Sequence, residues 1–192
     1  ALAFGAATAV QAADTPPPWA YGFTTQVPPG TPPAEPNPQQ VLDNVTLHTI
    51  PGSKFSFTRA QIADRYGPAD WFPEDHPAMP EIVAKGKVFA QPQVYACSLC
   101  HYPNGKGRPE NANITGLTYE YFIQQMMDFR SGARKTSDPR KANTGLMTRF
   151  AQMMTDDEIK AAAQYFTAIP ATPWITVVEG ATVPKTKPQN GM

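Results

Sequence analysis

The chain has 192 residues, enough for one domain of ordinary size with substantial extensions. Hydrophobic residues make up 41%, which is typical of a globular protein and excludes a chain built mainly of membrane-spanning segments. The 16 basic residues balance the 16 acidic ones, so no overall charge favours nucleic acid as a partner.

The chain begins with an uncharged stretch, residues 1–13, which ends in small residues with an Ala-x-Ala-like site near Ala12 and Ala13. This pattern predicts the tail of a secretory signal peptide, and the competing interpretation is an ordinary disordered or helical start. Thirteen residues are too few to span a bilayer, but with residues upstream the segment could act as a membrane anchor.

Residues 14–78 are expected to form a proline-rich arm, because 14 of the 22 prolines fall within the first 80 residues. Such a stretch favours extended polyproline segments over helix. Weak strand character is present at residues 45–47. A short helix is predicted over residues 58–66, with Thr58 as its N-cap and a stop at Gly67-Pro68.

The central domain is predicted to span residues 79–170 and to begin with a helix from Pro80 to about Phe89. Gly86 is expected to let this helix approach the last helix of the domain at Tyr165 or Phe166. A Gly- and Asn-rich loop is predicted over residues 103–117.

Two further helices are predicted from their caps and apolar spacing. Thr118 begins the first, which ends at Gly132. Thr155 and Glu158 form a capping box for the second, which ends before Pro170. The expected buried positions are Phe122, Ile123, Met126, Phe129, Ile159, Ala162, Ala163 and Phe166.

The stretches around these helices are predicted to be irregular. A loop containing Pro139 and Gly145 leads to Met147, between the two helices. Residues 171–192 form a C-terminal extension, in which residues 174–179 have strand composition. The coarse fold class is therefore all-α with irregular, proline-rich extensions.

The only two cysteines lie in the motif Cys97-Ser98-Leu99-Cys100-His101. Cys-x-x-Cys-His is typical of covalent haem attachment. The spacing of the thiols on one helical turn suits the two vinyl groups, and the adjacent histidine is then placed to ligate the iron.

Two other chemistries compete for the same cysteines. A thioredoxin-like dithiol needs a βαβ context, whereas here a helix is predicted before the motif and a loop after it. A structural zinc site needs a fourth ligand, which His48 or His76 could supply, but adjacent Cys100 and His101 do not easily share one tetrahedral centre.

The sixth iron ligand decides the function. The candidates are His48, His76 and the methionines at positions 79, 126, 127, 147, 153 and 154. Met126 and Met127 are expected to pack in a helix, and Met153 and Met154 precede the last helix, where Met154 is expected to form a hydrophobic staple. Met147 differs, because the predicted loop allows it to approach the iron from the open face.

From about residue 79 to residue 169 the chain resembles class I cytochromes c, nearest the two-domain periplasmic ones. The resemblance covers about half of the chain. It rests on the haem-attachment motif and on Ala84-Lys85-Gly86-Lys87, Tyr121, Gln125, Phe129, Gly132, Arg134, Met147 with Ala151, the helix start Thr155-Asp156-Asp157-Glu158, and Ala163-Gln164-Tyr165-Phe166.

The resemblance implies a class I fold of about four to five helices around one haem c, with Cys97 and Cys100 attached to it and His101 and Met147 as axial ligands. It also implies that the carbonyl of Pro109 receives the ring N–H of His101. Gln125 and Arg134 are then expected to face a haem propionate, and Tyr121 to lie in or next to the haem pocket. The competing interpretations are an ordinary loop proline and a solvated surface arginine.

Electron transfer is the expected function, because a six-coordinate iron with no open position only gains and loses an electron. The expected partners are an exported dehydrogenase, an oxidase or another cytochrome. The expected location is the periplasm or another exported location, with association with a membrane as a further option. Two alternatives stay open: a haem enzyme with an open or labile sixth site, and one piece of a multihaem electron conduit.

Overall fold

The computed structural model describes residues 30, 42–89, 93–136, 142–173 and 175–182. These residues form six α-helices, one 3-10 helix and one pair of two-residue strands, which confirms the all-α class. The predicted signal remnant and residues 14–29 and 31–41 of the proline-rich arm lie outside the described residues. None of the helices in the described part is both long and apolar enough to cross a membrane.

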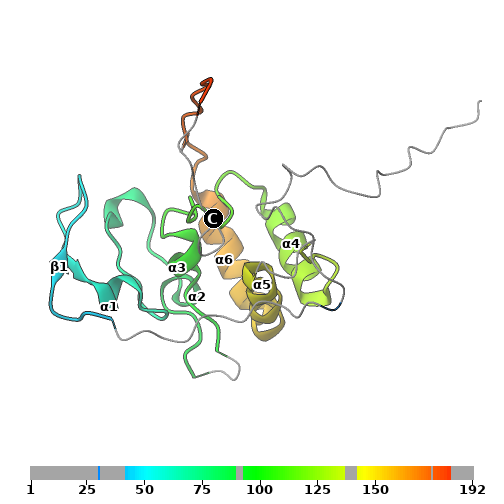
Figure 1. The fold of residues 1–192 in the computed structure, drawn as a ribbon. Helices are drawn as coiled ribbons and strands as arrows, with labels where there is room; N and C mark the ends of the chain where they lie inside the picture. The colour runs from blue at the N-terminus through cyan, green and yellow to red at the C-terminus, as the bar shows by residue number, and fades with distance from the viewer. Residues whose placement is uncertain (1–29, 31–41, 90–92, 137–141, 174, 183–192) are drawn as a thin grey trace, which may run out of the picture.

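The longest helices gather around one central helix, α6 (Asp156–Ala168). Figure 1 shows α2 (Glu81–Ala84) and α3 (Cys97–His101) on one side of α6, and α4 (Tyr119–Ser131) and α5 (Ala142–Met153) on the other. Contacts of α6 with α2 and α4, and of α4 with α5, hold this arrangement together.

The core lies on the inner face of α6. Ile159, Ala163 and Phe166 of this helix have no exposed surface, and Val83 of α2 is equally buried. Phe166 stacks on Phe122 of α4, with ring centroids 6.3 Å apart. The amphipathic spacing therefore predicts most of the core, although Ile123 and Phe129 are only half-buried against it.

Both long helices with a predicted cap begin and end where expected. The hydroxyl of Thr118 accepts a hydrogen bond from the backbone N–H of Tyr121, and Gly132 ends α4 in the left-handed region at φ +78°. Thr155 and Glu158 form the capping box of α6, and Ile169 is its C-cap. The predicted caps are confirmed. They can be predicted from the sequence because each depends on hydrogen bonds between residues close together in the chain.

The N-terminal described segment is a small hairpin followed by one helical turn. Strands β1 (Leu47–His48) and β2 (Phe57–Thr58) pair antiparallel, slightly beyond the predicted strand at residues 45–47. Helix α1 (Arg59–Ile62) begins at the predicted cap but ends before residue 66. Its end has a local cause, because the carboxylate of Asp64 accepts a hydrogen bond from the Tyr66 N–H in competition with the helix.

The helix predicted over residues 80–89 is much shorter in the structure. A 3-10 turn, η2 (Pro73–Asp75), precedes it, Pro80 is its N-cap, and α2 ends at Ala84. Gly86 has a φ of +65°, and Lys87 then pairs with Val94 in an isolated β-bridge. The predicted role of Gly86 is also wrong, because a Cβ there would lie 2.2 Å from the carbonyl oxygen of Val94 and not against α6.

The loop predicted around Gly145 is wrong, because residues 142–153 form α5. The apolar residues Leu146, Met147, Phe150 and Ala151 recur at helical spacing and face the protein. Gly145 has no positive φ, and a Cβ there would meet nothing within 4 Å. This glycine therefore makes no conformational demand. The other loop residue, Pro139, lies outside the described residues.

The strand predicted at residues 174–179 is also wrong for its described part. Residues 175–179 have no regular structure, and Ile175, Val177 and Val178 are largely exposed. A β-branched composition forms a strand only where an edge is available for pairing. Trp174 lies outside the described residues.

Candidate functional site

The attachment motif forms a single helical turn, α3, whose position is fixed by α2. The hydroxyl of Ser98 donates a hydrogen bond to the carbonyl of Val83 at 2.8 Å, and the Cys97 thiol lies 3.5 Å from the carbonyl of Ile82. Three residues apart on this turn, Cys97 and Cys100 lie on the same side of the helix. The predicted geometry of the two thiols is therefore present.

Both thiols border one large cavity of about 500 Å³, a size typical of cofactor sites. Residues from α3 to α6 and from the loop after α3 line it. Seven of the eight predicted site residues border this cavity, namely Cys97, Cys100, His101, Tyr121, Gln125, Arg134 and Met147. The eighth, Pro109, does not.

His101 is held by the carbonyl of Ala112, which lies 2.9 Å from its Nδ1. A carbonyl oxygen only accepts, so Nδ1 carries the proton and Nε2 keeps its lone pair for a metal. Burial by the surrounding protein lowers the pKa of His101, while the Ala112 hydrogen bond opposes that shift. The neutral imidazole is the form that ligates iron.

The predicted hydrogen bond to Pro109 is therefore wrong. The backbone N–H of Asn111 donates to the carbonyl of Arg108 at 2.8 Å, which closes a turn with Pro109 at its first corner. The chain reverses there, and the carbonyl of Ala112 instead of Pro109 reaches the ring.

The two thiols lack the properties of a redox dithiol. Burial raises the pKa of Cys97 to about 12, and burial also raises the pKa of Cys100. Reactive thiols need a lowered pKa, because the thiolate is the nucleophile. No βαβ unit is present among the described residues.

A zinc site finds no support in the described part of the chain, which contains no group of three or more His, Cys, Asp and Glu able to hold a metal ion. His76 has other partners, because its Nε2 lies 3.0 Å from an oxygen of Asp70 and its Nδ1 lies 2.8 Å from the carbonyl of Pro77.

Three methionines border the cavity: Met126, Met147 and Met154. Met126 and Met154 are each only 6% exposed and belong to the buried core, as predicted for packing residues. Met147 is half-buried on α5. Of the three thioethers, that of Met147 is the least committed to packing.

Polar groups occupy another part of the cavity wall. Arg134 donates a hydrogen bond to the side-chain carbonyl of Gln125, and its guanidinium lies 5.0 Å from the centre of the Phe129 ring. Lys135 borders the same cavity. Two cations here could pair with the carboxylates of a bound group.

Sequence reasoning missed several residues of the site. Asn143 on α5 donates a hydrogen bond to Asn111 at 3.0 Å, and both border the cavity. Tyr95 and Phe150 border it too, with ring centroids 5.2 Å apart. The polar run at residues 111–113 hinted at the first pair. The second pair had no local signal, because its members lie 55 residues apart.

The cavity is bordered by two thiols, by cations and by a histidine whose Nε2 is free to ligate a metal. These features fit a covalently attached haem. Comparison with known proteins agrees with this chemistry. The cytochrome c family model matches residues 83–169. The chain is 31% identical over 77 residues to cytochrome c-554(548) of Halomonas halodenitrificans, which covers 40% of this chain and 87% of that protein.

Two longer relatives are also similar to the chain. Cytochrome c4 of Azotobacter vinelandii is 35% identical over 72 residues, or 36% of this chain and 32% of that protein. The thiosulfate dehydrogenase electron acceptor of Stutzerimonas stutzeri is 37% identical over 71 residues, or 36% of this chain and 31% of that protein. The match thus spans about a third of each of these two relatives.

No solved structure is significantly similar to the chain. The expected class I fold is nevertheless confirmed by the family match and by the helical architecture around the cavity. On these grounds the chain belongs to the cytochrome c family and binds haem c covalently.

Proposed function

We propose that the chain is a monohaem cytochrome that passes single electrons between exported redox partners, with His101 and Met147 as the iron ligands. The observation that carries the proposal is one cavity bordered by both thiols, by a histidine protonated on Nδ1, and by the half-buried thioether of Met147. The bound haem supplies the one-electron iron couple.

The residues divide this work among themselves. Cys97 and Cys100 hold the haem through thioether bonds, so a small domain keeps a cofactor that it does not fully enclose. Ala112 fixes the orientation of His101 and strengthens it as a ligand. A thioether ligand at Met147 favours the ferrous state and raises the reduction potential. Arg134 and Lys135 offset the charge of the propionates.

An electron carrier fits better than a haem enzyme. A peroxidase-like site needs an acid–base group beside the sixth position of the iron. Neither His48 nor His76 borders the cavity, although both are among the described residues. A six-coordinate iron offers no position for a substrate.

The partners and the location follow from the same chemistry. Covalent haem attachment on the outer side of the cytoplasmic membrane, together with the signal-like residues 1–13, supports an exported, periplasmic protein. An exported dehydrogenase, an oxidase or another cytochrome is the expected partner. The relative from Stutzerimonas stutzeri is named as the electron acceptor of thiosulfate dehydrogenase, which supports a dehydrogenase as the partner.

The proposed organisation is a haem domain at residues 79–170 between an arm and a C-terminal extension. The family match at residues 83–169 supports its central part. The number of haems is tested by the mass of the protein purified from its native source. One haem added to a chain of 20.9 kDa, less any removed signal, supports the proposal. A larger mass with a second haem supports a multihaem conduit.

The ligand proposal is tested with Met147→Ala and a control, Met153→Ala, on the same helix but away from the cavity. We expect Met147→Ala to abolish the near-infrared band that iron–thioether charge transfer gives in the oxidised protein, and to lower the reduction potential. The control should keep both properties. A band that survives in Met147→Ala excludes this residue as the ligand.

A further inference from the structure

Arg65 and Tyr66, which follow α1, form hydrogen bonds with the segment that precedes the haem-attachment helix α3. The backbone N–H of Ala96 donates to the carbonyl of Arg65 at 2.8 Å. The hydroxyl of Tyr66 donates to the side-chain carbonyl of Gln93 at 2.5 Å. Arg65 and Tyr66 both lie outside residues 83–169, the region that the cytochrome c family model matches.

The side chain of Arg65 contacts Tyr95 in two ways. Its guanidinium carbon lies 4.7 Å from the centre of the Tyr95 ring, and Nη1 donates to the tyrosine hydroxyl at 2.9 Å. The ring of Tyr66 meets the same tyrosine edge to face, with centroids 5.9 Å apart. Three contacts from one short segment therefore fix a single aromatic ring.

The other side of Tyr95 belongs to the haem site. Its ring packs edge to face against Phe150 of α5, and both residues border the haem cavity. Phe150 lies three residues after Met147, so the two side chains share one face of the helix. A continuous set of contacts thus runs from Arg65 through Tyr95 and Phe150 to the helix that carries the proposed iron ligand.

We propose that Arg65 is a positioning residue of the haem site, which acts through Tyr95 and is supplied by a segment outside the family domain. This inference rests on the proposed ligation by His101 and Met147. Arg65 holds Tyr95 against α5, and its half-buried guanidinium adds a positive charge behind the cavity wall. A fixed positive charge near a haem favours the reduced form, which carries one positive charge less than the oxidised form.

The test compares the reduction potentials of four variants of the full-length haem protein. Arg65→Met should shift the potential to lower values, because it removes the charge and the hydrogen bond to Tyr95. Arg65→Lys keeps the charge and should restore most of the potential. Tyr95→Phe keeps the ring on Phe150 and loses only the hydroxyl, so it should give a smaller shift in the same direction. Arg59→Met, in the exposed part of α1, should leave the native potential.

A purely structural role for Arg65 predicts a different result. Arg65→Met would then lower the unfolding temperature, while the folded protein would keep the native potential, and that outcome overturns the proposal. If Arg65→Met yields no folded protein, a native potential in Tyr95→Phe overturns it instead. Failure of the proposed ligation is recognised separately, because the native protein itself would then lack the near-infrared band.

Discussion

The two walls of the haem cavity are built in different ways. The wall that carries His101 consists of α3 and the loop after it. Local hydrogen bonds close the backbone of this loop, and the side chains of Lys106 and Tyr165 add hydrogen bonds over 66 and 62 residues. Gly107 donates to the carbonyl of His101 at 2.8 Å, Arg108 to that of Cys100 at 3.0 Å, and Ile114 to that of Gly105 at 2.9 Å. In each of these three pairs, the donor and the acceptor are at most nine residues apart in the sequence.

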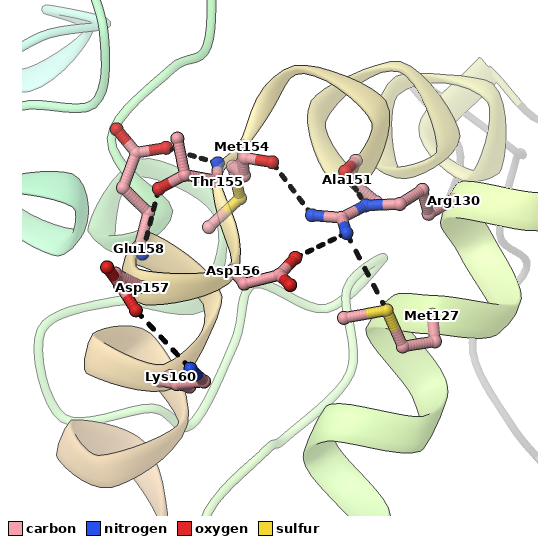
Figure 2. A network of polar contacts seen from close by, with 9 residues as sticks. All are labelled: Met127, Arg130, Ala151, Met154, Thr155, Asp156, Asp157, Glu158 and Lys160. Carbon is pink, nitrogen blue, oxygen red and sulfur yellow. Dashed lines mark hydrogen bonds and ion pairs between the residues drawn. The ribbon is translucent and has the colours of Figure 1, made fainter.

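The wall that carries Met147 depends on distant side chains. Arg130 of α4 donates to the carbonyls of Ala151 and Met154, over 21 and 24 residues, and its guanidinium also pairs with Asp156 (Figure 2). Lys87 donates to the carbonyl of Met153 over 66 residues. The terminal carbonyls of α5 are therefore satisfied by two cations from elsewhere in the fold.

This difference has a consequence for how each wall fails. A locally bonded loop is broken by a change in its own backbone, whereas a helix held by distant cations is released by the loss of one side chain. The two walls can therefore be perturbed one at a time, by substitutions that leave every proposed haem ligand in place.

The largest effect is expected at Gly107. This residue has a φ of +79°, and a Cβ there would lie 2.5 Å from the carbonyl oxygen of Ala112, which holds the His101 ring. We expect Gly107→Ala to lower the free energy of unfolding by about 3–4 kcal/mol, from backbone strain and from the displaced carbonyl together. Denaturant unfolding of the haem protein, followed by circular dichroism, measures this loss.

Gly132→Ala is the matched control for this substitution. Its φ of +78° imposes the same backbone strain, but a Cβ there meets nothing within 4 Å. We expect a loss of about 1 kcal/mol. Equal losses in the two variants would show that the close approach of Gly107 to Ala112 adds nothing to stability.

The same contrast between the walls explains what could be predicted from the sequence. The attachment motif, the caps at Thr118 and Thr155, and the apolar face of α6 are local patterns, and the structure confirms them. The predicted acceptor of the His101 ring N–H is Pro109, whereas the structure has Ala112. The turn at Pro109 reverses the chain and brings the later carbonyl to the ring. Pro139 and Gly145 predict a loop before Met147, whereas the structure forms α5 there, because the apolar residues from Leu146 to Ala151 recur at helical spacing.

Long-range contacts had no signal in the sequence at all. Nothing near Arg65 indicates that it meets Tyr95, and nothing near Arg130 indicates that it caps α5. Such contacts arise only when the helices pack. Local patterns therefore predict the wall that carries His101 and the candidate ligands, but not the side chains that hold the wall that carries Met147 in place.

The next largest effect is expected at Arg130. Arg130→Met leaves the carbonyls of Ala151 and Met154 without their charged donor, at distances of 2.9 and 2.8 Å in the native structure. Because hydrogen bonds to charged groups contribute about 1.5–3 kcal/mol, we expect the free energy of unfolding to fall by about 2–3 kcal/mol. The near-infrared band should also be lost at a lower temperature than in the native protein, because α5 is released.

Lys160→Met tests whether any lost surface cation has this effect. Lys160 pairs with Asp157 at 3.3 Å, in an exposed contact within α6 that is also drawn in Figure 2. Such pairs contribute little, so we expect a change within about 0.5 kcal/mol. If this variant loses as much stability as Arg130→Met, the proposed role of the α5 carbonyls is incorrect.

The smallest expected effect is a pH dependence at the same junction. The hydrogen bond and the charge of Arg130 lower the pKa of Asp156 below its usual value. A lowered pKa in the folded state adds stability above the unfolded-state value, about 3.9, and this stability is lost as the pH falls through the folded-state pKa. The unfolding free energies of the native protein and Asp156→Asn should therefore differ at neutral pH and converge in acid.

The difference at neutral pH should vanish when Arg130→Met is present in both proteins, because the double-mutant cycle isolates the pair. A difference that persists without Arg130 would contradict the prediction. The effect of Asp156 would then come from its place as the first residue of α6, near the helix N-terminus, and not from its contact with Arg130.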